Sequence, residues 1–123
     1  METSTIELTK DNVEHVVNQR GTVLIDFWAS WCGPCWMFAP VFEHAAASHP
    51  DISFATVNTE VELELARAFR ISSIPTLVAI RDGVILYTQP GALPATALEE
   101  LIGRVHAVDM STMRATAAGA RAR

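Results

Sequence analysis

Hydrophobic and polar positions along the 123-residue chain alternate between short apolar runs and longer stripes with helical spacing. Residues 23–28 are nearly all apolar and β-branched or aromatic, a pattern typical of a strand buried on both faces of a sheet. Asp82-Gly83 favours a tight hairpin turn between two later runs. The pattern predicts strands near Ile6 and at 23–28, 52–58, 76–80 and 84–88.

Four stretches repeat their apolar residues with the period of a helix. We expect the first helix to begin at Thr9 and to end at Arg20, before Gly21. The spacing predicts the others at 32–48, with a kink at Pro40, at 60–69, and from Pro94 onward. The core-facing positions of the second are predicted to be Cys35, Phe38, Ala39, Phe42, Ala45 and Ala46. Those of the last are Leu98, Leu101, Ile102 and Val105.

This order of elements predicts an α/β fold with a central mixed sheet and helices on both of its faces. The length favours one domain, which we expect to span residues 1–108. Residues 109–123 lose the apolar pattern and are expected to form a flexible tail. Glu60, Glu62 and Glu64 fall where the third helix is expected to start, and acidic side chains are favourable at a helix N-terminus.

Composition narrows the classes of function. Fourteen acidic and nine basic residues give a net charge of −5, which argues against a nucleic-acid partner. No apolar run reaches the roughly 18 residues of a membrane helix, and the first residues do not resemble a secretory signal. We therefore expect a monomeric cytoplasmic protein that contacts neither nucleic acid nor membrane.

The two cysteines, Cys32 and Cys35, lie at the junction of a buried strand and a helix. Side chains three apart in a first helical turn share one face and can form a disulfide. Backbone N–H groups at the helix start favour a thiolate, and we expect Cys32 at the exposed tip with Cys35 buried behind it. Two inert core cysteines or half of a zinc site remain the alternatives.

Asp26 interrupts the apolar strand at 23–28. A carboxylate buried there without a partner would raise its pKa, and such a group can pass protons to a thiol that must ionise. The alternative is an Asp that is paired at the end of the strand. Six residues separate Asp26 from Cys32, so we expect the two side chains to lie near one another.

The segment Asp26-Phe-Trp-Ala-Ser-Trp-Cys-Gly-Pro-Cys35, followed by Ala39-Pro40, resembles the active-site segment of the thioredoxin family. Ile74-Pro75-Thr76-Leu77, Asp82-Gly83 and Gly91-Ala92-Leu93 occur in the order and spacing of that family. The resemblance covers about residues 5–107. It implies a thioredoxin fold and a protein disulfide reductase.

The resemblance also implies roles for individual residues. Cys32 would be the nucleophile, Cys35 the resolving thiol and Asp26 the proton relay. Pro75 would be a cis-proline facing the disulfide, with the Ile74 backbone offering hydrogen bonds to an extended substrate segment. The remaining candidate substrate-binding residues are Trp31, Gly33, Pro34, Trp36 and Gly91. We expect disulfide-containing protein substrates, an NADPH-dependent flavoprotein thioredoxin reductase as partner, and no cofactor or metal bound to the chain itself.

Two positions depart from the family. Trp36 follows the second cysteine where most relatives have Lys, and Thr56 replaces a Lys expected to face Asp26. Without these cations, Asp26 is expected to hold its proton to higher pH than in relatives. Trp36 has two interpretations: an apolar anchor for a docking partner, or a side chain folded back onto its own helix.

Two other functions compete with the reductase. A disulfide oxidant or isomerase of the same fold would stabilise its thiolate with a His or charged residue between the cysteines, where Gly33-Pro34 offers neither. A redox-indifferent binding module could use the surface around Pro75. The cysteine pair and Asp26 both favour the reductase.

Overall fold

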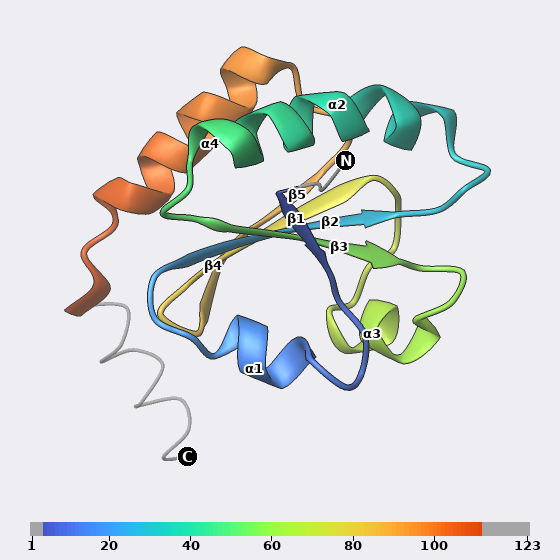
Figure 1. Cartoon of the computed structure of the whole chain (residues 1–123), viewed down its shortest axis with the longest axis horizontal. Coiled ribbons are helices and arrows are strands. Elements are labelled where there is room, and N and C mark those ends of the chain that lie inside the picture. Colours follow the sequence, from blue (N-terminus) through green and yellow to red (C-terminus); the bar gives the residue numbers. More distant parts are fainter. Residues whose placement is uncertain (1–3, 112–123) are drawn as a thin grey trace.

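The computed structural model describes residues 4–111, which form a five-stranded sheet between two layers of helices (Figure 1). The strands are β1 (Thr5–Glu7), β2 (Thr22–Trp28), β3 (Ser53–Asn58), β4 (Thr76–Arg81) and β5 (Val84–Pro90). Their order is β1-β3-β2-β4-β5, with β1, β3 and β2 parallel and with β4 antiparallel to both of its neighbours. The prediction of a mixed sheet flanked by helices is confirmed.

The helices are α1 (Val13–Val17), α2 (Gly33–Ser48), α3 (Leu63–Ala68) and α4 (Ala95–Ala107). In Figure 1, α2 and α4 cover one face of the sheet, and α1 and α3 cover the other. Each face has its own apolar core, because successive residues of a buried strand point to opposite sides. Leu24 joins the core beneath α2 and α4, and its neighbours Val23 and Ile25 join the other. Burying each such side chain contributes roughly 1.5–3 kcal/mol.

The buried stripes were predicted well in the two long helices. In α4 all four expected positions are buried. In α2 five of the six are buried, and Ala39 is half-buried because it borders a cavity. The helix continues as one element through Pro40, and Cys32 is its N-cap rather than its first residue.

The first and third helices are shorter than predicted. Asn12 Oδ1 accepts the Thr9 N–H, and Asn12 Nδ2 donates to the Glu7 carbonyl, so these residues form a turn instead of a first helical turn. The third helix begins at Leu63, because Glu60 contacts a distant loop. Helix propensity reflects only the residue types within a segment and gives no information about either contact. Both predicted helix starts were therefore too early.

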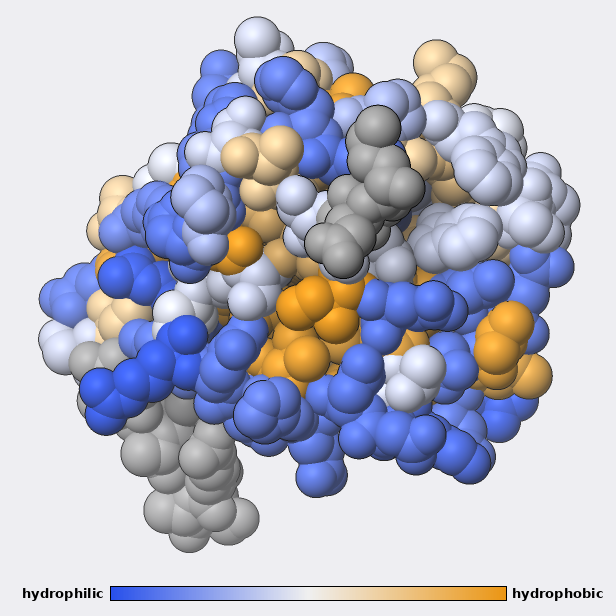
Figure 2. All heavy atoms as spheres, viewed as in Figure 1, coloured by the Kyte–Doolittle hydropathy of each residue, from blue (hydrophilic) through white to orange (hydrophobic). Residues whose placement is uncertain are grey.

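Packing continues beyond α4, where Met110 is buried. Arg81 of β4 donates to the carbonyls of Val105, His106 and Val108, which satisfies the C-terminal end of α4. The expected tail at 109–123 lies mostly outside the described residues. Figure 2 shows hydrophilic side chains along α1 and α3, with apolar side chains at the centre of this face, near β1. No helix among residues 4–111 is long and apolar enough to cross a membrane.

Candidate active site

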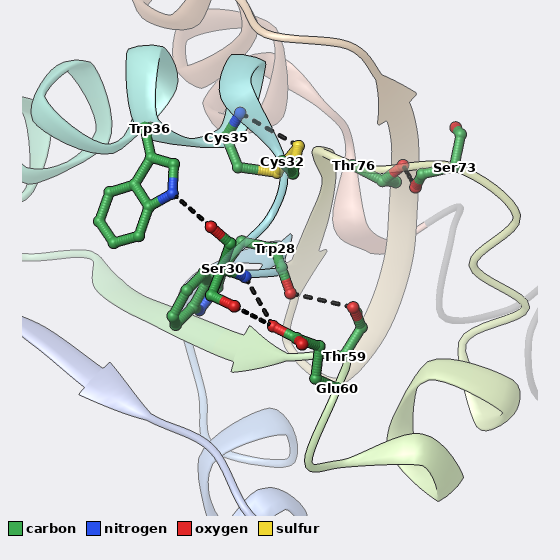
Figure 3. Close-up of a disulfide and its surroundings, with 9 residues drawn as sticks. All are labelled: Trp28, Ser30, Cys32, Cys35, Trp36, Thr59, Glu60, Ser73 and Thr76. Atoms are coloured by element: carbon green, nitrogen blue, oxygen red, sulfur yellow. Dashed lines mark hydrogen bonds between the residues drawn. A yellow bond between two sulfur atoms is a disulfide. The ribbon is translucent and has the colours of Figure 1, made fainter.

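The two cysteines lie where β2 ends and α2 begins, and they form a disulfide (Figure 3). Their Cα atoms are 5.3 Å apart. The backbone N–H of Cys35 donates to Cys32 Sγ across 3.2 Å, so the sulfur of Cys32 fills the N-cap position of a 16-residue helix. A hydrogen bond and a helix N-terminus both stabilise negative charge on that sulfur.

The expected difference in exposure between the two cysteines is wrong for this disulfide form. Cys32 is 4% exposed and Cys35 is 3% exposed. Both pack with Ala29, Trp28 and Ile74 in one apolar cluster, which covers Cys32 as fully as the helix covers Cys35. The chemical difference between the sulfurs therefore comes from the hydrogen bond at the helix start rather than from exposure.

Asp26 lies in the middle of the sheet, with Thr56 beside it on β3 and Leu77 beside it on β4. Its side chain is buried, and Oδ1 has no hydrogen-bond partner among the described residues. Burial raises the pKa of Asp26 from 3.8 to about 7, because desolvation penalises the charged form. The alternative of a paired carboxylate is wrong, and Thr56 is placed beside Asp26 as predicted.

A cavity of about 200 Å³ joins Asp26 to Cys35. One face of α2 lines it on one side, and the sheet lines it on the other. Its lining residues are Thr5, Asp26, Trp28, Cys35, Trp36, Ala39, Phe42, Glu43 and Thr56. The cavity brings the buried carboxyl and the second cysteine together, and Cys32, which is bonded to Cys35, is not among its lining residues. The expected proximity of Asp26 and Cys32 stays a prediction.

Trp36 folds back over the loop that precedes α2. Its indole Nε1–H donates to the Ser30 carbonyl across 2.8 Å, and its ring meets Trp28 edge-on with centroids 5.8 Å apart (Figure 3). The side chain remains 57% exposed. The indole thus contacts Ser30 in the preceding loop and Trp28 at the end of β2, and more than half of the side chain is open to solvent.

The segment before β4 faces the disulfide from the other side. The Ile74–Pro75 peptide bond is cis, as the resemblance implied, and Ile74 packs against the cluster that contains the two cysteines. The Pro75 carbonyl accepts the Gly91 N–H across 2.8 Å, and Gly91 has a positive φ of 93°. Within residues 4–111, the Ile74 backbone makes no hydrogen bond.

A shallow groove runs from this segment to Trp31, which is 72% exposed. None of the side chains that line it is acidic or basic: they are Trp31, Thr59, Ala66, Ile71, Ser72, Ser73 and Ile74. Gly33 and Pro34 are exposed at the start of α2. The predicted site residues thus lie around one end of the sheet.

Glu60 is the site residue that the sequence did not reveal. Its Oε1 accepts both the hydroxyl and the backbone N–H of Ser30, in the loop between β2 and α2 (Figure 3). These two hydrogen bonds lower the pKa of the Glu60 carboxyl. The nearest sequence signal was its position after β3, since the C-terminal ends of neighbouring parallel strands meet at one edge of a sheet.

Known proteins are similar to this chain in both sequence and fold. Residues 4–104 match the Thioredoxin family model. The chain is 54% identical to putative thioredoxin 2 of Streptomyces coelicolor, over 91% of this chain and 84% of that protein. It is 40% identical to thioredoxin of Bacillus subtilis, over 69% of this chain and 83% of that protein.

Solved structures agree with these relatives. Mitochondrial thioredoxin 3 of Saccharomyces cerevisiae, in its oxidised form, superposes with a TM-score of 0.75 at 30% identity, covering 82% of this chain and 95% of that one. The fold and the redox-active Cys32–Cys35 pair define a thiol–disulfide oxidoreductase. The chain belongs to the thioredoxin family.

Proposed function

We propose that this oxidoreductase works as a reductase of protein disulfides, with Cys32 as the nucleophile and Cys35 as the resolving thiol. The Cys35 N–H that donates to Cys32 Sγ carries the assignment. In the reduced protein the same donor would stabilise a Cys32 thiolate at the helix start, and the thiolate is the form that attacks a disulfide. A disulfide oxidant is less well supported, because no charged side chain stands between the two cysteines.

In the first step, the Cys32 thiolate attacks one sulfur of the substrate disulfide. A mixed disulfide forms between Cys32 and that sulfur, and the other substrate sulfur leaves as a thiolate that takes up a proton. In the second step, Cys35 loses its proton and attacks Cys32 Sγ. The second substrate sulfur leaves, and the Cys32–Cys35 disulfide of this structure results. Two electrons pass from the dithiol to the substrate.

We assign to Asp26 the role of accepting the proton of Cys35 in the second step. The two residues line one cavity, and the carboxyl has a pKa of about 7. A base whose pKa lies near the working pH combines a useful ionised fraction with enough basicity to take a proton. Because a cavity of this size with a carboxyl oxygen in its wall can hold a single bridging water molecule, the transfer does not require direct contact.

The outer side of the disulfide is suited to an extended substrate segment. The unpaired Ile74 backbone can add such a segment as a strand, while the Pro75 carbonyl stays held by Gly91. Trp31 offers apolar area beside this edge, and Gly33 and Pro34 are exposed next to Cys32, which is itself 4% exposed in the disulfide form. The exposed part of the Trp36 side chain offers a further apolar surface to a partner.

Each turnover leaves the protein oxidised, so an electron donor must restore the dithiol. We assign that role to a thioredoxin reductase, a flavoprotein that draws on NADPH, as the family implies. A cycle of this kind operates in a reducing compartment, which makes the cytoplasm the proposed location.

The test is insulin reduction by the purified chain with NADPH and a thioredoxin reductase. We expect NADPH consumption that disappears in Cys32→Ser. Cys35→Ser should form stalled mixed disulfides with protein substrates, which non-reducing electrophoresis reveals. Trapping by Cys32→Ser but not by Cys35→Ser would reverse the two roles, and no NADPH consumption with any reductase would reject the reductase cycle.

A further inference from the structure

Glu60, Ser30 and Trp36 form a chain of hydrogen bonds to one side of the disulfide (Figure 3). Glu60 accepts the Ser30 hydroxyl and N–H, and the Ser30 carbonyl accepts the Trp36 indole N–H. The edge-on contact with the Trp28 ring further restricts the orientation of the indole. A half-exposed tryptophan with a hydrogen bond and an aromatic contact has a defined position, in contrast to Met37 beside it, which is exposed and has neither contact.

That position is in the wall of the cavity that contains Asp26. Trp36 and Glu43 lie at its solvent-facing side on α2, since both are exposed, whereas Asp26 and Cys35 line its buried side. Asp26 Oδ1 is buried without a hydrogen-bond partner, so a water molecule that enters from this side could donate a hydrogen bond to it. Removing the indole would widen the opening of this cavity on its α2 side.

The charged groups around Asp26 are few. From α2, Cys35 and Glu43 face the cavity, and the sheet contributes Thr5 and Thr56 as lining residues, with Leu77 beside Asp26 on β4. No lysine, arginine or histidine among residues 4–111 lines the cavity. Hydration is therefore the main variable that a change at position 36 can alter.

We propose that Trp36 is a positioning residue that closes the Asp26 cavity and thereby sets the pH range in which Asp26 serves Cys35. The proposal rests on the proton-relay role given to Asp26 under the proposed function. With the indole in place, few water molecules reach the carboxyl, and its charged form is disfavoured. With the indole removed, water solvates the carboxylate, and the carboxyl titrates at lower pH.

The first measurement is a pH titration of Asp26 in the oxidised protein. The ¹³C chemical shift of the carboxyl reports the titration, in protein that is labelled only at Asp. Oxidised protein removes the Cys35 thiol as a second titrating group, and Asp labelling removes the Glu43 signal. We expect Trp36→Ala to lower the midpoint by about one pH unit. Trp36→Phe keeps a ring against Trp28 but loses the donor to Ser30, so its midpoint should fall in between.

Met37→Ala is the matched control, because it removes a large exposed side chain from the same helix without touching the cavity. Its Asp26 midpoint should equal that of the wild type. An unchanged midpoint in Trp36→Ala, or an equal shift in Met37→Ala, would overturn the proposal. Circular dichroism of each variant checks that the fold is retained, which the exposure of both side chains favours.

The second measurement is the pH dependence of mixed-disulfide release, the step in which Cys35 attacks. Trp36→Ala should move this profile to lower pH with the Asp26 midpoint, and should have no such effect in an Asp26→Asn background. If Trp36→Ala still moves the profile there, Trp36 acts on something other than Asp26. The ¹³C titration needs no enzymatic activity, so a chain that fails to reduce insulin but shows the shifted midpoint would contradict only the proposed function.

Discussion

The two sides of the Cys32–Cys35 disulfide differ in what surrounds them. On the inner side lies a cavity lined by Asp26, Cys35 and Glu43, where the carboxyl of Asp26 is buried without a partner. On the outer side lies a shallow groove from Trp31 to Ile74 whose lining contains no charged side chain. Trp28 and Trp36 border the cavity, and Trp31 borders the groove.

This difference separates two tasks that a disulfide reductase must perform. A confined cavity changes the pKa of a carboxyl strongly, because few water molecules can solvate its charge. An open apolar groove leaves titration unaffected but offers surface that a partner can bury. Changes on the inner side should therefore alter pH dependence for every substrate. Changes on the outer side should alter the choice of substrate at any pH.

The largest effect on the inner side is expected from Asp26→Asn. An amide cannot accept the proton of Cys35, so disulfide release near neutral pH should slow roughly tenfold or more, with protein and small disulfides alike. Stopped-flow measurement of release from a mixed disulfide tests this. Equal rates in mutant and wild type would remove Asp26 from the mechanism.

The same substitution should stabilise the protein at neutral and alkaline pH. The unfolded chain releases the Asp26 proton near pH 4, whereas the folded chain holds it to about pH 7. Between these values the folded state binds more protons, so wild-type stability falls as pH rises, and above pH 7 the loss stays constant. The free energies of unfolding from urea titrations should differ little below pH 4 and by up to about a few kcal/mol above pH 7. A mutant less stable than wild type at pH 8 would contradict the assignment.

Much of the inner side could be predicted from the sequence, because it depends on position within regular elements. Asp26 interrupts a run of apolar residues, so its burial follows from the strand. Cys32 and Cys35 share a face because they are three apart at a helix start. The buried face of α4 follows from the helical spacing of its apolar residues, and all four predicted positions are buried.

The parts that could not be predicted depend on contacts between distant segments. Glu60 was assigned to a helix start, but its carboxylate binds Ser30, thirty residues earlier in the chain. The direction of Trp36 depends on a carbonyl in the loop that Glu60 holds. The burial of Cys32 in one cluster with Cys35 involves Ile74, a residue about forty positions later in the chain.

On the outer side, Trp31→Ala should have the next largest effect. Because this side chain is 72% exposed and borders the groove, its loss should raise the KM for insulin about tenfold while the rate with DTNB stays near that of wild type. The pH profile should not move. A changed pH profile, or equal losses on both substrates, would show that the two sides of the disulfide do not act separately.

Trp36→Lys is expected to have a smaller effect, and it compares the two tryptophans directly. The added cation should lower the Cys32 pKa slightly, since positive charge near the helix start favours the thiolate. If the open face of Trp36 also anchors partners, reduction of protein substrates should weaken more than reduction of DTNB. Iodoacetamide alkylation against pH measures the first effect, and paired assays with insulin and DTNB measure the second. Equal changes on both substrates would limit Trp36 to the inner side.

The smallest effect is expected from Glu60→Ala, which acts on the loop that connects the two sides. Glu60 is exposed, and its carboxylate is replaceable by water, so the fold should remain intact. The Ser30 N–H, however, loses its acceptor and should exchange with solvent faster, which hydrogen exchange followed by NMR can measure. Because hydrogen bonds from Ser30 hold the Glu60 pKa below its usual value, acidification should reproduce this loosening in the wild type as pH falls through that lowered pKa. Glu62→Ala, two residues away and outside the hydrogen-bond chain, is the control and should leave Ser30 exchange unchanged. If Ser30 exchange is equally slow in Glu60→Ala, the indole of Trp36 and the turn geometry hold the loop by themselves.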